Sequence, residues 1–353
     1  MARRFSLLVI GFAITLLVSA GRVRGESAPA VLGLLLPPEE PAARSVHQGV
    51  LAAVAEANES GNAGVRLAVR GRQGPWGSDA AEAARLVMDD GATALLAPPD
   101  GAASHLVLQV SGRTGVPVAS LCPDASVTRT ALTWMVRVVP SNMDEAHAIF
   151  QRCAKSRWLA FVPAGRAGRE AANDLKGAAG KRRVIAKSVE TAEPVPDAAA
   201  VRALLSSVHP DGVLLWLDPV PAGRLARSLR AAGFAGTIAG PLRLASSAFA
   251  AEAGAAAEGL FVPGLAAPHD GARSAFERTY RVLFGTDPDA PAAFAHDAAA
   301  LLIGVVRKSG AAGARGAFPL SKPVRGASGL LTFDSHGNRV VALELLRYHD
   351  GRL

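Results

Sequence analysis

The sequence predicts an α/β protein with two lobes, each built on a parallel sheet with helices on both faces. Short apolar runs alternate with amphipathic stretches rich in alanine, leucine and arginine along nearly the whole chain. Parallel strands need crossover connections, which helices supply, so this alternation indicates parallel pairing. The alternation of strand-like and helix-like segments begins again near residue 142, which indicates a second lobe. Half of the 353 residues are apolar, which excludes a disordered or collagen-like chain.

The first series of elements runs from residue 30 to residue 121. Pro37 and Pro38 end its first strand, because proline lacks the N–H that a central strand donates. Gly61 and Gly64 mark the turn after its first helix. The expected strands are Ala30–Leu36, Val65–Val69, Ala94–Ala97 and Val116–Leu121, and the expected helices are His47–Asn58, Asp79–Asp90 and Ala102–Thr114.

The second series begins with a helix capped by Ser141 or Asn142. The C-terminus differs from both series, because Gly329–Phe333 and Val340–Tyr348 flank a turn and therefore predict a β-hairpin. The expected strands are Trp158–Val162, Val184–Ser188, Gly212–Leu217, Thr237–Ala239 and Gly259–Val262. The expected helices are Asn142–Ser156, Gly168–Ala179, Ala198–Val208, Pro221–Ala232, Ala272–Phe284 and Ala292–Ser309.

Residues 1–25 are predicted to be a signal peptide. Two arginines precede an apolar run over residues 5–18, and small residues follow at a site that signal peptidase could cut, after Ala20 or after Gly25. The run is short for a membrane-spanning helix of about 20 residues, so an uncleaved anchor is the weaker alternative. We expect a soluble, exported protein without stable membrane insertion after cleavage.

The basic composition raises the hypothesis of a nucleic-acid partner. The chain has 38 Lys+Arg against 30 Asp+Glu, a net charge of +8. Cleavage after Ala20 removes two arginines and leaves +6, and cleavage after Gly25 removes four and leaves +4. Aromatic residues make up only 5% of the chain, and they are not interleaved with basic residues as base stacking requires. We therefore predict no nucleic-acid partner.

Sequence motifs for catalysis, metals and cofactors are missing. The chain has no G-x-S-x-G elbow, H-E-x-x-H pair, Walker loop or G-x-G-x-x-G turn. We therefore predict that it is not an enzyme and has no catalytic residues, no metal and no cofactor. Cys122 and Cys153 are the two cysteines. In an oxidising compartment, a disulfide between them and two free thiols are both open alternatives.

Eight segments in order resemble a known family. Residues 49–67 (GVLAAVAEANESGNAGVRL) look like the opening helix and turn of type I periplasmic binding proteins. They are especially similar to the branched-chain amino-acid (Leu/Ile/Val) binding proteins of ABC importers. The other matching segments are 87–97 (VMDDGATALLA), 115–120 (GVPVAS), 136–141 (VRVVPS), 210–215 (PDGVLL), 259–262 (GLFV), 329–337 (GLLTFDSHG) and 348–351 (YHDG).

The resemblance implies two Rossmann-like lobes joined by a three-strand hinge. One lobe would contain residues 26–139 with 264–326, and the other residues 140–263 with 327–353. The implied function is capture of a small-molecule ligand in the periplasm by hinge closure, followed by delivery to an inner-membrane ABC permease. The protein would act as a monomer. The same fold serves receptors, so a ligand-sensing or accessory periplasmic role is the alternative.

The implied ligand site departs from the family pattern. In the family, a serine after the third strand and hydroxyl residues after the fourth strand hold the ligand carboxylate. Here the serine position falls near Gly101, with Asp100 beside it, and the fourth-strand loop contains Ser120 and Asp124. A carboxylate at these positions would repel the carboxylate of an amino acid. Plain leucine, isoleucine or valine is therefore not the expected ligand.

The predicted ligand-binding residues come from loops that follow strands. Trp76 would stack on a flat ligand or pack its own loop. The aspartates would receive hydroxyl or cationic groups or simply stabilise turns, and the arginines would clamp a carboxylate or lie on the surface. The predicted set is Trp76, Asp100, Gly101, Ser120, Asp124, Arg166, Asp218 and Arg243, with Glu39, Glu40 and Arg72 also facing the cleft. We expect His296 to be a packed helix residue.

Overall fold

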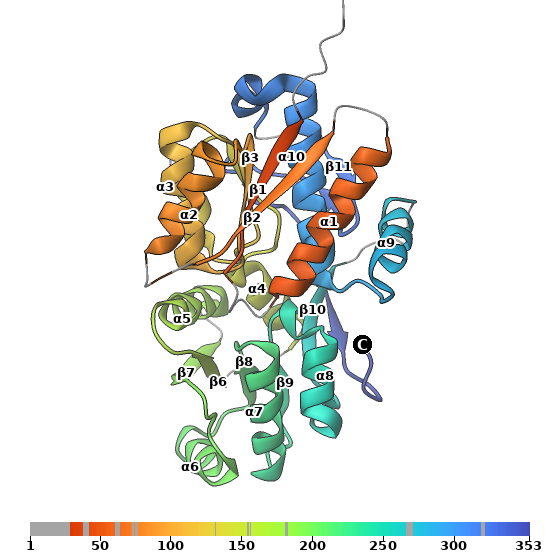
Figure 1. The fold of residues 1–353 in the computed structure, drawn as a ribbon. Coiled ribbons are helices and arrows are strands. Elements are labelled where there is room, and N and C mark those ends of the chain that lie inside the picture. The colour runs from red at the N-terminus through yellow and green to blue at the C-terminus, as the bar shows by residue number, and fades with distance from the viewer. Residues whose placement is uncertain are drawn as a thin grey trace, which may run out of the picture.

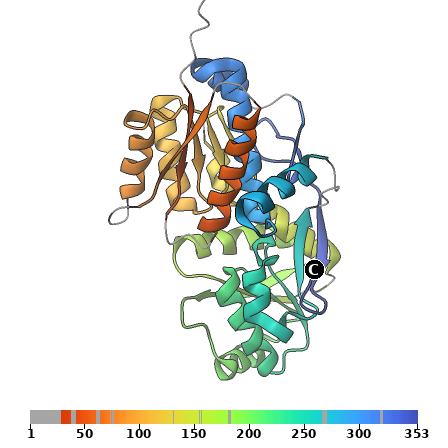
Figure 2. The same cartoon turned by 45° about the vertical axis from the view of Figure 1, so that its right-hand side comes forward.

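The computed structural model describes residues 29–37, 42–60, 64–72, 74, 77–130, 132–153, 155, 157–180, 183–265, 271–318 and 322–353. The predicted signal peptide, residues 1–25, lies outside these ranges. The described residues form two α/β lobes, one above the other in Figures 1 and 2. This arrangement confirms the predicted fold class.

The first lobe is built on a five-stranded parallel sheet with the order β2-β1-β3-β4-β5. Its strands are β1 (Ala30–Leu35), β2 (Val65–Arg70), β3 (Ala94–Ala97), β4 (Val118–Ser120) and β5 (Met135–Arg137). One face packs against α1 (Ala43–Glu59) and α10 (Ala290–Ala314), and the other against α2 (Ser78–Met88) and α3 (Gly101–Thr114). The helix α9 (Gly271–Phe284) packs against α1. Two separate apolar layers therefore hold the sheet between helices.

The second lobe is built on a six-stranded sheet with the order β13-β10-β9-β8-β6-β7. Its strands are β6 (Arg157–Pro163), β7 (Val184–Thr191), β8 (Gly212–Leu215), β9 (Thr237–Ala239), β10 (Phe261–Leu265) and β13 (Leu343–Arg347), and only β13 is antiparallel to its neighbour. The helices α4 (Asn142–Arg152) and α5 (Arg166–Ala179) cover one face. The helices α6 (Ala198–Val208), α7 (Pro219–Ala231) and α8 (Ser247–Ala253) cover the other.

Short 3-10 turns and one small ribbon complete the described fold. The turns are Ala125–Thr128, Leu242–Leu244, Gly254–Ala257 and Arg315–Ala317, and the ribbon pairs β11 (Val324–Gly326) with β12 (Gly329–Leu331).

The chain passes between the two sheets three times, and the first and third passes are tied to each other. Arg137, at the end of β5, donates its backbone N–H to Gly337 at 2.8 Å. Arg339 is 3% exposed and donates to the carbonyl of Val138 at 3.0 Å. Burial lowers the pKa of the Arg339 guanidinium to about 10, which leaves it charged at neutral pH. The second pass connects β10, which ends at Leu265, to α9, which begins at Gly271.

The predicted C-terminal hairpin is wrong in its pairing. A turn does form, with a single antiparallel bridge between Phe333 and Arg339. Beyond it the two arms separate: β12 pairs with β11, and β13 pairs with β10 in the second-lobe sheet. The sequence predicts the turn correctly, but β13 pairs over five residues with β10 at the edge of the second-lobe sheet instead of with β12.

One described helix segment, Ala290–Gly310 in α10, is long and apolar enough to cross a membrane. Within the fold, 67% of its most apolar window is buried. It packs along α1, where the backbone of Gly49 approaches Ala292 so closely that a Cβ on Gly49 would lie 2.1 Å from the Ala292 carbonyl oxygen. The segment is therefore part of the first-lobe core.

Candidate functional site

A cavity of about 350 Å³ lies between the two lobes. Both lobes contribute to its wall. The first lobe contributes Pro37, Arg72, Pro99, Asp100, Gly101, Cys122, Pro123 and Asp124. The second contributes Asn142, Pro163, Ala167, Glu170, Ala171, Trp216, Asp218 and Arg243.

The cavity is lined by residues that follow the carboxyl ends of parallel strands. Pro37 follows β1, Pro99 follows β3 and Cys122 follows β4, while Trp216 directly follows β8. In open α/β sheets this edge is where ligands bind, because the loops there are free to carry side chains while the strands fix their positions. Two such edges facing each other make an interlobe site.

The first-lobe wall contains two aspartates that cap short helices. Asp100 precedes α3 and accepts a hydrogen bond from the backbone N–H of Ala103 at 2.6 Å. Asp124 precedes the 3-10 turn at residues 125–128, and its Oδ1 accepts from the backbone N–H of Ser126 at 2.8 Å. Such caps satisfy N–H groups at a helix start. Capping therefore explains one oxygen of each carboxylate and leaves the other oxygen to be explained.

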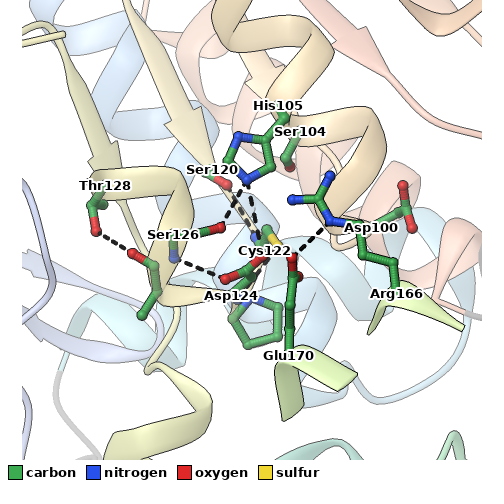
Figure 3. A network of polar contacts seen from close by, with 12 residues as sticks. Asp100, Ser104, His105, Ser120, Cys122, Asp124, Ser126, Thr128, Arg166 and Glu170 are labelled. Carbon is green, nitrogen blue, oxygen red and sulfur yellow. Dashed lines mark hydrogen bonds and ion pairs between the residues drawn. The ribbon is translucent and has the colours of Figure 1, made fainter. Parts of the chain in front are cut away.

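The second oxygen of Asp124 has no hydrogen-bond donor among the described residues, although the residue is only 9% exposed. His105 approaches this oxygen no closer than 4.0 Å, since its ring nitrogen is engaged with the Ser126 hydroxyl at 2.8 Å (Figure 3). Burial would raise the pKa of Asp124, but Glu170, Ser126 and His105 outweigh it and lower the pKa. Asp124 is thus an ionised, buried carboxylate with one oxygen open.

The second-lobe wall pairs its acids with arginines. Glu170 on α5 accepts from Arg166 at 2.7 Å, and Figure 3 shows Glu170 beside Asp124. Burial, together with the nearby Asp124 carboxylate, raises the pKa of Glu170, against the opposing effect of Arg166. Asp218 lies 3.5 Å from the Nε of Arg243. The two lobes therefore meet at a pair of carboxyl groups, Asp124 and Glu170.

A tryptophan forms the buried floor on the second-lobe side. Trp216 is 1% exposed, and its indole N–H donates to the side-chain oxygen of Asn142 at 3.0 Å. Asn142 in turn donates to Asp174 at 3.3 Å. This chain of hydrogen bonds fixes the indole ring, so the cavity has a rigid apolar floor below its charged walls.

The structure brings most of the predicted site residues to one place. Asp100, Gly101, Asp124, Asp218 and Arg243 line the cavity, and Arg166 reaches it through Glu170.

The other predicted residues lie elsewhere. Ser120 is fully buried and accepts a hydrogen bond from the backbone N–H of Cys122 at 3.1 Å, so its hydroxyl supports the loop from behind. His296 packs inside the first lobe, as expected. Trp76, Glu39 and Glu40 fall outside the described residues.

Sequence reasoning missed several lining residues. Glu170 lies one helical turn beyond the start of α5, inside a stretch predicted as an ordinary helix. Asn142 was predicted only as a helix cap, and Trp216 only as the end of a strand. The missed signal was position: Asn142 and Trp216 lie within a few residues of a strand end, and Glu170 lies near the start of the helix that follows β6.

Cys122 also lines the cavity. Both cysteines are free thiols in the structure, and burial raises the pKa of Cys122.

A second cavity of about 450 Å³ adjoins the first. It shares Pro99, Pro123, Asp218 and Arg243 with the first cavity and extends toward the start of α1 and the 3-10 turn at residues 242–244. The Asp218–Arg243 pair therefore lies where the two hollows of the interlobe cleft join.

The family model of the periplasmic binding proteins matches residues 32–335 of the chain. The match spans most of the chain, which belongs to the periplasmic binding protein family. Proteins of this family bind solutes and are not enzymes. No curated protein sequence matches the chain significantly.

Solved structures of solute-binding proteins share the fold. The leucine-binding protein LivK of Thermotoga maritima is 19% identical, with a TM-score of 0.79 over 91% of this chain and 96% of that one. LivJ of Streptococcus pneumoniae, in complex with isoleucine, is 15% identical, with a TM-score of 0.80 over 92% and 97%. An R. palustris ABC-transporter solute-binding protein, in complex with benzoate, is 18% identical, with a TM-score of 0.81 over 92% and 94%. At these identities the likeness shows the type I periplasmic binding fold, as predicted.

Proposed function

We propose that the protein is the substrate-binding protein of an ABC importer and captures a small ligand in the interlobe cleft by hinge closure. The observation that carries this proposal is the 350 Å³ cavity, whose wall is shared between strand-end loops of both lobes. A ligand that touches both walls favours the closed arrangement over the open one by its contacts to the second wall. The family and the solute-binding proteins of the same fold support this assignment.

The ligand is proposed not to be plain leucine, isoleucine or valine. A ligand carboxylate needs hydroxyl, N–H or cationic donors. The first-lobe wall instead presents Asp100 and Asp124, and the N–H groups that those residues cap are already used. The related folds also differ in ligand, since LivJ was solved with isoleucine and the R. palustris protein with benzoate.

The proposed roles of the site residues follow from their places in the wall. Asp100 and Asp124 would face the polar part of the ligand, and Gly101 leaves room for it. Asp218 and Arg243 would contact it from the second lobe. Arg166 would act through Glu170, and Ser120 through the loop that it supports. Stacking of Trp76 on the ligand remains a prediction.

The proposal includes export and a membrane partner. Residues 1–25 would direct the chain to the periplasm and be removed there, after Ala20 or Gly25. The mature, monomeric protein would then deliver its ligand to an inner-membrane ABC permease. Determining the N-terminal residue of the protein recovered from the periplasm tests the export step: an intact Met1 on a membrane-bound chain would contradict it.

The test of solute capture is exposure of the purified protein to a metabolite extract of its host. We expect native mass spectrometry to detect one small molecule bound at a 1:1 ratio and solution X-ray scattering to record a smaller radius of gyration on binding. A protein that retains no small molecule and keeps its radius would contradict capture by hinge closure.

A further inference from the structure

We propose that the interlobe cleft selects a compact organic cation, such as a protonated amine without a carboxylate, and that Asp124 is its principal anionic partner. This inference rests on the proposed function, because it names the ligand class of the same cleft. It is carried by the geometry around one buried carboxylate oxygen.

That oxygen is Oδ2 of Asp124. It is buried without a hydrogen-bond donor among the described residues, while Oδ1 is held by the N–H of Ser126. An ionised carboxylate accepts several hydrogen bonds, and leaving one of its oxygens buried and unpaired is costly. Asp124 also lines the cavity. When Glu170 is ionised and has no proton to share with Asp124, a ligand donor is the group that this geometry lacks.

Gly101 keeps the space beside Oδ2 open. A Cβ placed on Gly101 would lie 3.3 Å from Oδ2 of Asp124 and 3.6 Å from the sulfur of Cys122. A larger side chain at this position would therefore occupy the approach to the carboxylate oxygen. The absence of a side chain admits a ligand group to that point.

The charges around the cavity have a negative excess. Each arginine there is paired with an acid: Arg72 with Asp79 at 2.9 Å, Arg166 with Glu170 at 2.7 Å and Arg243 with Asp218 at 3.5 Å. Asp100 and Asp124 have no guanidinium or ammonium group within ion-pair distance among the described residues. Arg137 and Arg166 act on Asp124 only from beyond ion-pair distance. The first-lobe wall therefore attracts a cation and repels a carboxylate.

The pair of carboxyl groups between the lobes, Asp124 and Glu170, also favours a cationic ligand. Glu170 approaches Asp124 from the second lobe (Figure 3). Two carboxylates in contact repel each other unless a proton or a cation lies between them. A ligand ammonium would interact with both, and it would thereby link the two lobes in the closed form.

The surrounding wall suits an organic cation better than a metal ion. Pro99, Pro123, Pro163, Ala167 and Trp216 supply an apolar lining for a carbon skeleton. Among the described residues, the one group of metal-ligating side chains within mutual reach is Glu258, His349 and Asp350, which is exposed and lies away from the cleft. A divalent ion therefore lacks a prepared set of ligands in the cavity.

Isothermal titration calorimetry with matched probes tests the proposal on the mature protein. Isopentylamine is leucine without its carboxylate, and benzylamine replaces the carboxylate of benzoate with an aminomethyl group. We expect both amines to bind at 1:1, and leucine and benzoate to bind at least about tenfold more weakly. Magnesium and calcium chloride serve as inorganic cation controls and should not compete with the amines.

Two variants and one control isolate the role of Asp124. Asp124→Asn keeps an oxygen to cap Ser126 but removes the charge, and it should weaken amine binding by about tenfold or more. Gly101→Ser places a hydroxyl beside Oδ2 and should weaken it as well, which provides a second test should the first variant fold poorly. Asp197→Asn is the control, because Asp197 also caps a helix, at 2.8 Å to Ala200, but on α6, outside the cavity wall. It should bind amines like the native protein.

The outcomes separate this inference from the proposed function. Tighter binding of leucine or benzoate than of the amines would overturn the cation assignment and leave solute capture standing. The cation assignment would also be overturned if Asp124→Asn and Asp197→Asn bound amines with equal affinity. Competition by the divalent ions, or no detectable binding of any probe, would overturn it as well. Solute capture itself is judged by the metabolite-extract experiment, whose result does not depend on these probes.

Discussion

Two buried aspartates in this molecule have opposite surroundings. Asp297 lies in the first-lobe core and is 1% exposed. Its oxygens accept from the backbone N–H groups of Ala327 at 2.6 Å and Ser328 at 2.8 Å, and His296 lies 3.3 Å away. Asp124 in the cleft is nearly as buried, at 9% exposed, yet one of its oxygens has no donor among the described residues.

The difference shows how a buried charge reveals its role. A carboxylate whose partners are all within the chain joins segments together: Asp297 links α10 to the turn between β11 and β12. A carboxylate that keeps an oxygen open at the wall of a cavity has a place for a partner from outside. The same side chain therefore acts as a structural tie in one lobe core and as a binding group in the cleft.

The substitution Asp297→Asn should give the largest effect. Its amide group would turn donor atoms toward backbone N–H groups and remove the anion beside His296. Breaking a buried charged network of this kind costs about 3 kcal/mol or more of the free energy of unfolding. Urea denaturation measures that loss. A change below about 1 kcal/mol would show that the core network is not the tie described here.

The pH dependence of stability should report the same network. Burial alone would lower the pKa of His296, but Asp297 and Glu56 outweigh it and raise the pKa to about 9. Because the folded protein holds the His296 proton more tightly than the unfolded chain does, protonation stabilises the fold by about 3 kcal/mol at pH values below 6.5, the usual histidine pKa. This contribution is lost as the pH rises through 9. Denaturation midpoints at pH 6.5 and 9.5 should differ accordingly. Replacement of His296 by Gln should remove the difference, and a native protein without it would contradict the pairing.

The same change in the cleft, Asp124→Asn, should hardly affect folding. The new side chain keeps an acceptor for Ser126, and its amide can donate to Glu170. We therefore expect the free energy of unfolding to change by less than about 1 kcal/mol in the unliganded protein. Parallel denaturation of the Asp124→Asn and Asp297→Asn proteins measures the contrast. A loss at Asp124 as large as that at Asp297 would erase the distinction between the two aspartates.

The smallest expected effect is on the pH dependence of amine binding. Burial and Asp124 raise the pKa of Glu170 above its usual 4.5, so the folded protein keeps a proton there that the unfolded chain has lost. Charging Glu170 at higher pH therefore costs stability without ligand but adds attraction for an ammonium group, whose own pKa lies well above neutral pH. Benzylamine affinity should rise with pH from 4.5 toward 7. In a Glu170→Gln protein, benzylamine affinity should change less with pH. Equal slopes in the native and Glu170→Gln proteins would show that Glu170 does not cause the pH dependence.

The fold could be predicted from the sequence because its signals are local. Alternating apolar runs placed strands such as Ala94–Ala97 and helices such as Ala198–Val208 at the observed bounds. The C-terminal hairpin could not be predicted correctly, since the partner of β13 is β10, a strand about 80 residues earlier in the chain. Turn chemistry fixes a turn, but tertiary competition decides which strands pair.

The location of the site could be predicted from the sequence, but the balance of charges in it could not. Strand-end loops pointed to Asp100, Asp124, Asp218 and Arg243, and these residues do line one cavity. Their charge balance depends on partners that the sequence does not place, such as Arg243 beside Asp218 and Glu170 beside Asp124. Compensation between charges is a property of tertiary geometry, so only the structure identifies the open oxygen.

The charge of the natural ligand decides whether the interlobe cleft selects a cation. The protein can be purified from its host without denaturation, and native mass spectrometry followed by release and fragmentation identifies the small molecule that it retains. We predict one bound organic cation that has an amine or guanidine group and no carboxylate. Retention of a carboxylate-bearing solute in the cleft, with affinity unchanged by Asp124→Asn, would show that the cleft does not select a cation through Asp124.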